Sequence, residues 1–142
     1  MSDILVTALF CEDIRREQSG QRTLVGVLND TLAVPKFPGS FPRLGVFIRV
    51  AVPIARQIRV LEHRLLSPDG TKIAEILVPQ ELVNEIHTDA KSKGNPKYGF
   101  ISEFQMTMLG IEKAGIFEVI SKFDDEEVQS GFLNIVGVPE EG

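Results

Sequence analysis

Apolar and polar residues alternate with a period of two along several stretches of this 142-residue chain. The clearest stretch, residues 42–53, places five aliphatic side chains on one face of an extended chain: Leu44, Val46, Ile48, Val50 and Val52. Residues 100–109 and 116–123 alternate in the same way. Because successive side chains of a strand point to opposite faces of a sheet, this period predicts strands with one buried face.

Five further segments are predicted to be strands: 3–12, 22–28, 57–66, 71–78 and 128–136. Apolar residues lie on both faces of 3–12, so this strand is expected to be covered on both sides. In 128–136 the alternation changes phase at Ser130-Gly131, which predicts a β-bulge there. Turn residues separate the segments, most clearly Ser67-Pro68-Asp69-Gly70, where Pro presets φ and Gly accepts positive φ. The strands do not alternate with helices. We therefore expect an all-β fold, a single-domain antiparallel β-sandwich of about eight strands with immunoglobulin-like architecture.

The remaining segments are less regular. Residues 79–87 are predicted either as a short helix, which Pro79 in the first turn favours, or as an irregular strand. Residues 35–42 and 88–99 are rich in turn-forming or polar residues and are predicted to be loops. The domain is expected to span residues 1–138, and 139–142 to form a short acidic tail.

The charge balance and the cysteine content exclude several classes of protein. With 15 basic and 20 acidic residues the net charge is −5, which disfavours nucleic acid as a partner. The start of the chain lacks the features of a signal peptide, and no apolar run is long enough to span a membrane. The single cysteine, Cys11, excludes a disulfide within the chain and fits a reducing compartment, so we expect a cytoplasmic protein.

The opening part of the sequence is distinctive. It reads C-E-D-I-R-R-E at 11–17, L-V-G-V at 24–27 and F-P at 37–38, followed later by the P-D-G turn at 68–70. This resembles a family of small bacterial β-rich proteins that open with a C-[DE]-D-x-R-x-E…L-x-G-V hairpin. Gln21 stands where that family pattern has Lys. The resemblance implies a single β-rich domain and supplies no catalytic residues.

A dense polar cluster follows the first apolar run: Glu12, Asp13, Arg15, Arg16 and Glu17. It is predicted either to form an ion-pair patch that contacts a partner or, through its carboxylates, to hold a divalent cation. The alternative is a solvated strand end with weak salt bridges. Neither His63 nor His87 lies near Cys11 in the sequence, so a catalytic cysteine is not expected. The two histidines are expected to be structural, and no metal or other cofactor is expected.

The arginines lie between Arg15 and Arg64. Five of them fall on the predicted strands 42–53 and 57–66 and their connection: Arg43, Arg49, Arg56, Arg59 and Arg64. If these strands pair, their outward arginines form a basic stripe that docks an acidic partner, including the acidic half of a second copy. The alternative is a solvated sheet face. Phe47, outward between Arg43 and Arg49, marks either a dimer face or a covered position.

Phe37 and Phe41 in the Pro-rich loop are predicted either to plug the open end of the sandwich or to form an exposed apolar knob. No catalytic motif is present, so the favoured function is a non-enzymatic binding or assembly module that acts through a sheet face or edge. Its partner is expected to be a second copy or another protein. The alternative is a small-ligand or carbohydrate-binding sandwich that uses the end loops 35–42 and 88–99, with Tyr98 as the aromatic of the second loop.

Overall fold

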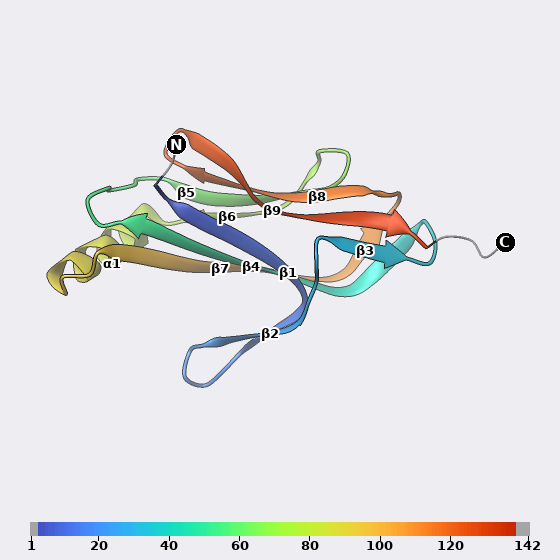
Figure 1. Ribbon diagram of the computed structural model, residues 1–142, viewed down its shortest axis with the longest axis horizontal. Coiled ribbons are helices and arrows are strands. Elements are labelled where there is room, and N and C mark those ends of the chain that lie inside the picture. The colour runs from blue at the N-terminus through green and yellow to red at the C-terminus, as the bar shows by residue number, and fades with distance from the viewer. Residues whose placement is uncertain (1–2, 139–142) are drawn as a thin grey trace.

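The computed structural model describes residues 3–138 as two β-sheets packed face to face, with a helix at one end (Figure 1). The four-stranded sheet has the order β2-β1-β4-β7. Its strands are β1 (Leu5–Arg16), β2 (Arg22–Val27), β4 (Gly39–Pro53) and β7 (Lys97–Ile111). The five-stranded sheet has the order β3-β9-β8-β5-β6. Its strands are β3 (Thr31–Val34), β5 (Leu61–Leu66), β6 (Lys72–Val78), β8 (Gly115–Phe123) and β9 (Glu126–Gly137).

Neighbouring strands are antiparallel except β3 and β9, which run parallel. The predicted all-β sandwich is confirmed, with nine strands in the described residues rather than about eight. The acidic tail at 139–142 lies outside the described residues.

The core lies between the inner faces of the two sheets. On β4, all five aliphatic residues of the predicted inner face are buried, with Val46 and Ile48 fully inaccessible. From the other sheet, β8 contributes Phe117, Val119 and Phe123, all buried. The alternation of apolar and polar residues thus identifies the inner face of these strands. Successive side chains of a strand point to opposite faces of its sheet, and in a sandwich the other sheet covers one of these faces.

The segment 35–42 is only partly a loop, because β4 already begins at Gly39. Pro42 lies inside this strand and has no N–H group to give to a neighbouring strand. β1 pairs with β4 only from Gly45 onward, so before that residue β4 pairs with β7 alone. The prediction of a loop over 35–42 is wrong from Gly39 onward, because a proline is tolerated where a strand has only one neighbouring strand.

The ambiguous segment after Pro79 is a helix, α1 (Gln80–Ser92), which is longer than predicted. Its buried residues Val83, His87 and Ala90 follow helical spacing, and the polar residues between them face solvent. The prediction of a loop over 88–99 is therefore wrong: the helix continues to Ser92 and β7 begins at Lys97.

Three local features shape the strands. The register between β8 and β9 shifts beside Ser130, which matches the phase change in the sequence. At Gly131 a Cβ atom would lie 2.6 Å from the Ala8 carbonyl oxygen, so β9 crosses β1 at a position that only glycine can occupy. On β7, Met108 has a φ of 52° and is 71% exposed, although the alternation places it on the inner face with Phe104.

Candidate functional site

The outward face of the four-stranded sheet gathers exposed apolar side chains around an arginine. In the register of β1, β4 and β7, one row consists of Thr7, Arg49 and Ile101. The flanking rows are Leu5, Ala51 and Gly99 on one side and Leu9, Phe47 and Glu103 on the other. Leu5 is 61% exposed and Ile101 56%. The expectation that the first strand is covered on both sides is therefore wrong.

Arg49 occupies the centre of this face and is exposed. Its cross-strand neighbours Thr7 and Ile101 are uncharged, and no carboxylate within residues 3–138 forms an ion pair with it. A guanidinium group presents a planar fork of N–H donors that matches a carboxylate in two simultaneous hydrogen bonds. Arg49 is therefore available to bind a carboxylate from outside the chain.

The β1–β2 hairpin packs against the same outward face at Gly45. A Cβ atom on Gly45 would lie 2.9 Å from Cγ1 of Ile14 and 3.0 Å from Sγ of Cys11. Ile14 is 4% exposed, and the Cys11 thiol is fully buried and donates to the Gly45 carbonyl oxygen at 3.6 Å. Burial raises the pKa of Cys11 above its ordinary value. The thiol is consequently shielded and protonated.

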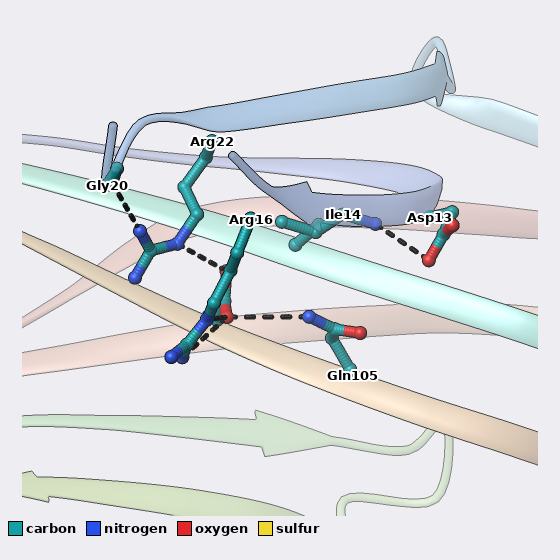
Figure 2. A network of polar contacts seen from close by, with 7 residues as sticks. Asp13, Ile14, Arg16, Gly20, Arg22 and Gln105 are labelled. Carbon is teal, nitrogen blue, oxygen red and sulfur yellow. Dashed lines mark hydrogen bonds and ion pairs between the residues drawn. The ribbon is translucent and has the colours of Figure 1, made fainter. Parts of the chain in front are cut away.

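An ion-pair clasp joins this hairpin to β7 (Figure 2). Arg16 donates from Nε and Nη2 to Oε1 of Glu103 at 3.0 and 2.9 Å, and Arg22 donates from Nε to Oε2 at 3.2 Å. The Glu103 side chain is only 10% exposed. Gln105 adds a longer contact to Oε1 at 3.4 Å. The clasp stiffens one border of the outward face and leaves two arginines sharing one carboxylate.

The predicted polar cluster does not converge on one point. Arg16 binds Glu103, Asp13 accepts from Arg43 at 3.5 Å, and Arg15 lies 4.0 Å from Glu17. Glu12 instead lies beside Gly26 on the facing strand. Within residues 3–138 no group of three or more His, Cys, Asp or Glu side chains is arranged to hold a metal ion. Sequence reasoning missed Glu103, which the alternation of β7 assigns to water, because its partners are 81 and 87 residues away.

The predicted arginine stripe does not form, because β4 and β5 belong to different sheets. Arg56 pairs with Asp3 at 3.0 Å and with Glu126 at 3.3 Å, and Arg64 pairs with Glu127 at 2.8 Å. Arg59 is exposed in the connection between the sheets. Its backbone N–H donates to Asp124, whose carboxylate also accepts from Val60. Of the stripe, Arg43 and Arg49 lie together on β4.

The two phenylalanines of the Pro-rich segment lie at one end of the sandwich. Phe41 is a buried core residue, and Phe37 is half-buried against the core. Next to them is a hollow of about 670 Å³ whose lining includes Leu28, Leu32 and Phe41. At the other end of the domain, Tyr98 is buried, and its hydroxyl donates to the Arg56 carbonyl oxygen at 2.6 Å. The segments 35–42 and 88–99 thus lie at opposite ends of the domain, and most of 88–99 is helix or strand instead of a loop.

Both histidines are buried in the described structure. His87 Nε2 lies 2.9 Å from the Ile54 carbonyl oxygen, and its ring contacts Tyr98 edge-on at 4.7 Å between centroids. His63 Nδ1 lies 2.7 Å from Oγ of Ser121. Burial lowers the pKa of His63 from 6.5 to about 4, so its ring is neutral at pH 7.

The chain matches the model of a protein family. The model of a group described as Family of unknown function (DUF6941) matches residues 6–136. No curated protein matches the chain. Within residues 3–138, no helix is long and apolar enough to cross a membrane.

Proposed function

Because this chain belongs to the DUF6941 family, whose function is unknown, we propose a role from the geometry of the chain itself. The protein is a non-enzymatic protein-binding module, and its contact surface is the outward face of the four-stranded sheet around Arg49. The occupant of this face is a protein surface that sets a carboxylate among apolar side chains.

The observation that supports this most is the exposed Arg49 at the centre of an apolar sheet face, where no described residue forms an ion pair with it. Leu5, Leu9 and Ile101 leave substantial apolar area in water beside it, and Phe47 adds a half-buried ring. Arginine and aromatic side chains dominate the energetic centres of protein interfaces. Burying this surface against a partner removes apolar area from water, and a partner carboxylate satisfies the guanidinium group.

The charge of the face selects an acidic partner. The face and the hairpin that borders it carry five arginines against four carboxylates: Arg15, Arg16, Arg22, Arg43 and Arg49 against Glu12, Asp13, Glu17 and Glu103. Among the described residues, Arg49 is the one of these arginines that has no ion pair. A symmetric dimer through this face would set Arg49 against Arg49, and like charges across an interface are unfavourable. The partner surface is therefore a different one with the opposite charge.

A binding role without catalysis agrees with the state of the reactive side chains. Cys11 is buried with a raised pKa, and the rings of His63 and His87 are directed to interior partners. The free thiol of Cys11 supports a reducing location, so we place the protein in the cytoplasm. A bacterial source is part of the same proposal and rests on the C-E-D-x-R-x-E resemblance.

Site-specific photo-crosslinking tests the proposal. A photoreactive phenylalanine analogue replaces Thr7, which lies beside Arg49 on the exposed face. We expect crosslinks in intact cells to peptides that combine Asp or Glu with apolar residues. Arg49→Glu should reduce their yield at least about tenfold, because it removes a central contact and adds repulsion.

The matched control is Arg59→Glu, which reverses an exposed arginine away from this face and should leave the yield unchanged. An equal yield from the parent chain and the Arg49→Glu variant would overturn the proposal.

A further inference from the structure

The outward face of the five-stranded sheet has the same design as the Arg49 face but carries the opposite charge. Its central strand is β8, with β9 and β5 on either side. Glu118 points outward from β8, opposite Phe132 on β9 and Leu66 on β5. Along β8 its outward neighbours are Ile116, 44% exposed, and the half-buried Ile120. Phe132 is 42% exposed.

Glu118 differs from the other acidic residues of its sheet. Glu75 pairs with Lys72 and Glu127 pairs with Arg64, each at 2.8 Å. Glu62 lies directly opposite Lys122 in the β5–β8 register. For Glu118, by contrast, the described residues supply neither an ion-pair nor a hydrogen-bond partner, and its neighbours across both strands are apolar. A carboxylate surrounded by exposed apolar side chains is the partner chemistry that the Arg49 face requires.

We infer that the partner of the Arg49 face is the Glu118 face of a second copy of this chain, an inference that rests on the proposed function. Arg49 of one copy pairs with the carboxylate of the next copy's residue 118, and the apolar side chains around each charge meet. Stacked sheets lie about 10 Å apart, a distance that an arginine and a glutamate side chain bridge together.

The contact is heterologous, because two different faces meet. In a pair, one copy keeps its Glu118 face free and the other keeps its Arg49 face free, so association proceeds head to tail instead of stopping at a closed dimer. This arrangement avoids the Arg49–Arg49 contact of a symmetric dimer. It also uses both outward sheet faces, whose apolar side chains would otherwise remain in water.

The size of the faces indicates how strong the association is. Strands lie about 4.8 Å apart and outward residues recur about every 6.8 Å along a strand, so each position covers about 30 Å². The three rows of three residues around Arg49 therefore give about 300 Å² of flat area per copy. This is below the roughly 800 Å² per partner of a stable interface. The association is therefore weak, appears as the protein concentration rises, and is sensitive to salt.

Charge-reversal variants test this by light scattering and sedimentation over a concentration series. We expect the average molar mass of the parent chain to rise above 15.7 kDa with concentration and to fall again at high salt. Arg49→Glu and Glu118→Arg each place like charges across the contact. Each should require at least about tenfold more protein for the same association.

Mixing the two variants is the decisive step. An equimolar mixture brings Arg49 of one variant against Glu118 of the other and should regain association. A symmetric contact through the Arg49 face would leave Glu118→Arg unaffected. Control variants Arg59→Glu and Glu112→Arg change exposed charges outside the two faces and should behave as the parent. Circular dichroism checks folding, and Arg49→Gln and Glu118→Gln replace any variant that does not fold.

A monomeric parent chain, an unaffected Glu118→Arg variant, or a mixture that stays monomeric would each overturn the inference. The proposed function would survive any of these results if Thr7 crosslinks to carboxylate-bearing peptides of another protein and Arg49→Glu abolishes them. Loss of both the self-association and the Arg49-dependent crosslinks would remove the proposed function as well.

Discussion

Lowering the pH from 7 to 4 should destabilise this fold through the side chain of His63. The ring is completely buried, and its Nδ1 atom lies 2.7 Å from Oγ of Ser121. Its Nε2 atom has no hydrogen-bond partner among the described residues. A charged imidazolium at this position would lack the solvation it has in the unfolded chain. This burial lowers the pKa of His63 from 6.5 to about 4.

The sign and the size of this change in unfolding free energy follow from the linkage between proton binding and folding. Between these two pKa values the unfolded chain binds the proton and the folded chain does not, so acid favours unfolding. The part of the unfolding free energy that depends on a neutral His63 is fully present above pH 6.5. It is lost as the pH falls from 6.5 through about 4. At about 1.4 kcal/mol per pKa unit, the total loss is about 3 kcal/mol. That is a large part of the 5–15 kcal/mol by which domains are typically stable.

Urea unfolding followed by circular dichroism at pH 4, 5, 6 and 7 measures this loss. The unfolding free energy of the parent chain should fall between pH 7 and pH 4. In His63→Gln this fall should be about 3 kcal/mol smaller, because the buried group no longer titrates. The control Ser121→Ala removes the hydroxyl group beside Nδ1 but leaves the buried imidazole in place, so its unfolding free energy should still decrease toward pH 4. The carboxyl group of Asp69, whose pKa is lowered to about 2 by hydrogen bonds from Ser67 and Thr71, titrates below this range. An unchanged pH dependence in His63→Gln would refute the reasoning.

Three other perturbations test the hairpin and its contacts. Gly45→Ala places a Cβ atom 2.9 Å from Ile14 and should lower the unfolding free energy by about 1–3 kcal/mol. Gly110→Ala, with no atom within 4 Å, should cost less than about 1 kcal/mol in the same chemical denaturation, and equal costs would contradict the packing argument. Glu103→Gln weakens the ion pairs with Arg16 and Arg22 and should accelerate amide hydrogen exchange in β2 relative to β8. Equal protection of β2 in the parent chain and in the variant would show that these ion pairs do not hold the hairpin. Cys11 should react with a thiol reagent at least about a hundredfold more slowly in the folded chain than in urea, because the thiol is buried and its pKa is raised. Equal reaction rates would show that the hairpin does not cover the thiol.

Features with a local physical cause could be predicted from the sequence. The inner face of β4 follows from its period of two, because the pleat of an extended chain alone sets which side chains share a face. The turn at Ser67–Gly70 forms as expected, with the Gly70 N–H donating to the Ser67 carbonyl oxygen at 2.9 Å. The bulge beside Ser130 could be read from a change of phase within one strand. The end of α1 was missed because Ala90 alone marks the buried side of its last turn.

Features that depend on which segments meet could not be predicted. The arginine stripe assumed that consecutive strands pair, whereas the connection after β4 crosses to the other sheet. The Arg16–Glu103 contact joins residues 87 positions apart, so no local pattern marks Glu103 as a partner. Cys11 shares the outward face with Leu9, and only the return of the hairpin onto Gly45 makes it inaccessible.

The sequence by itself therefore determined eight of the nine strands of the described residues, the buried face of β4 and the all-β class, because these depend on the pleat and the conformational preferences of each residue. Only the tertiary structure decided which charges remain unpaired. Arg56 and Arg64 pair with carboxylates from distant segments, while Arg49 and Glu118 each lie on a central strand with uncharged cross-strand neighbours. The physical reason is that an ion pair requires two side chains within a few ångströms, a distance set by sheet order and register.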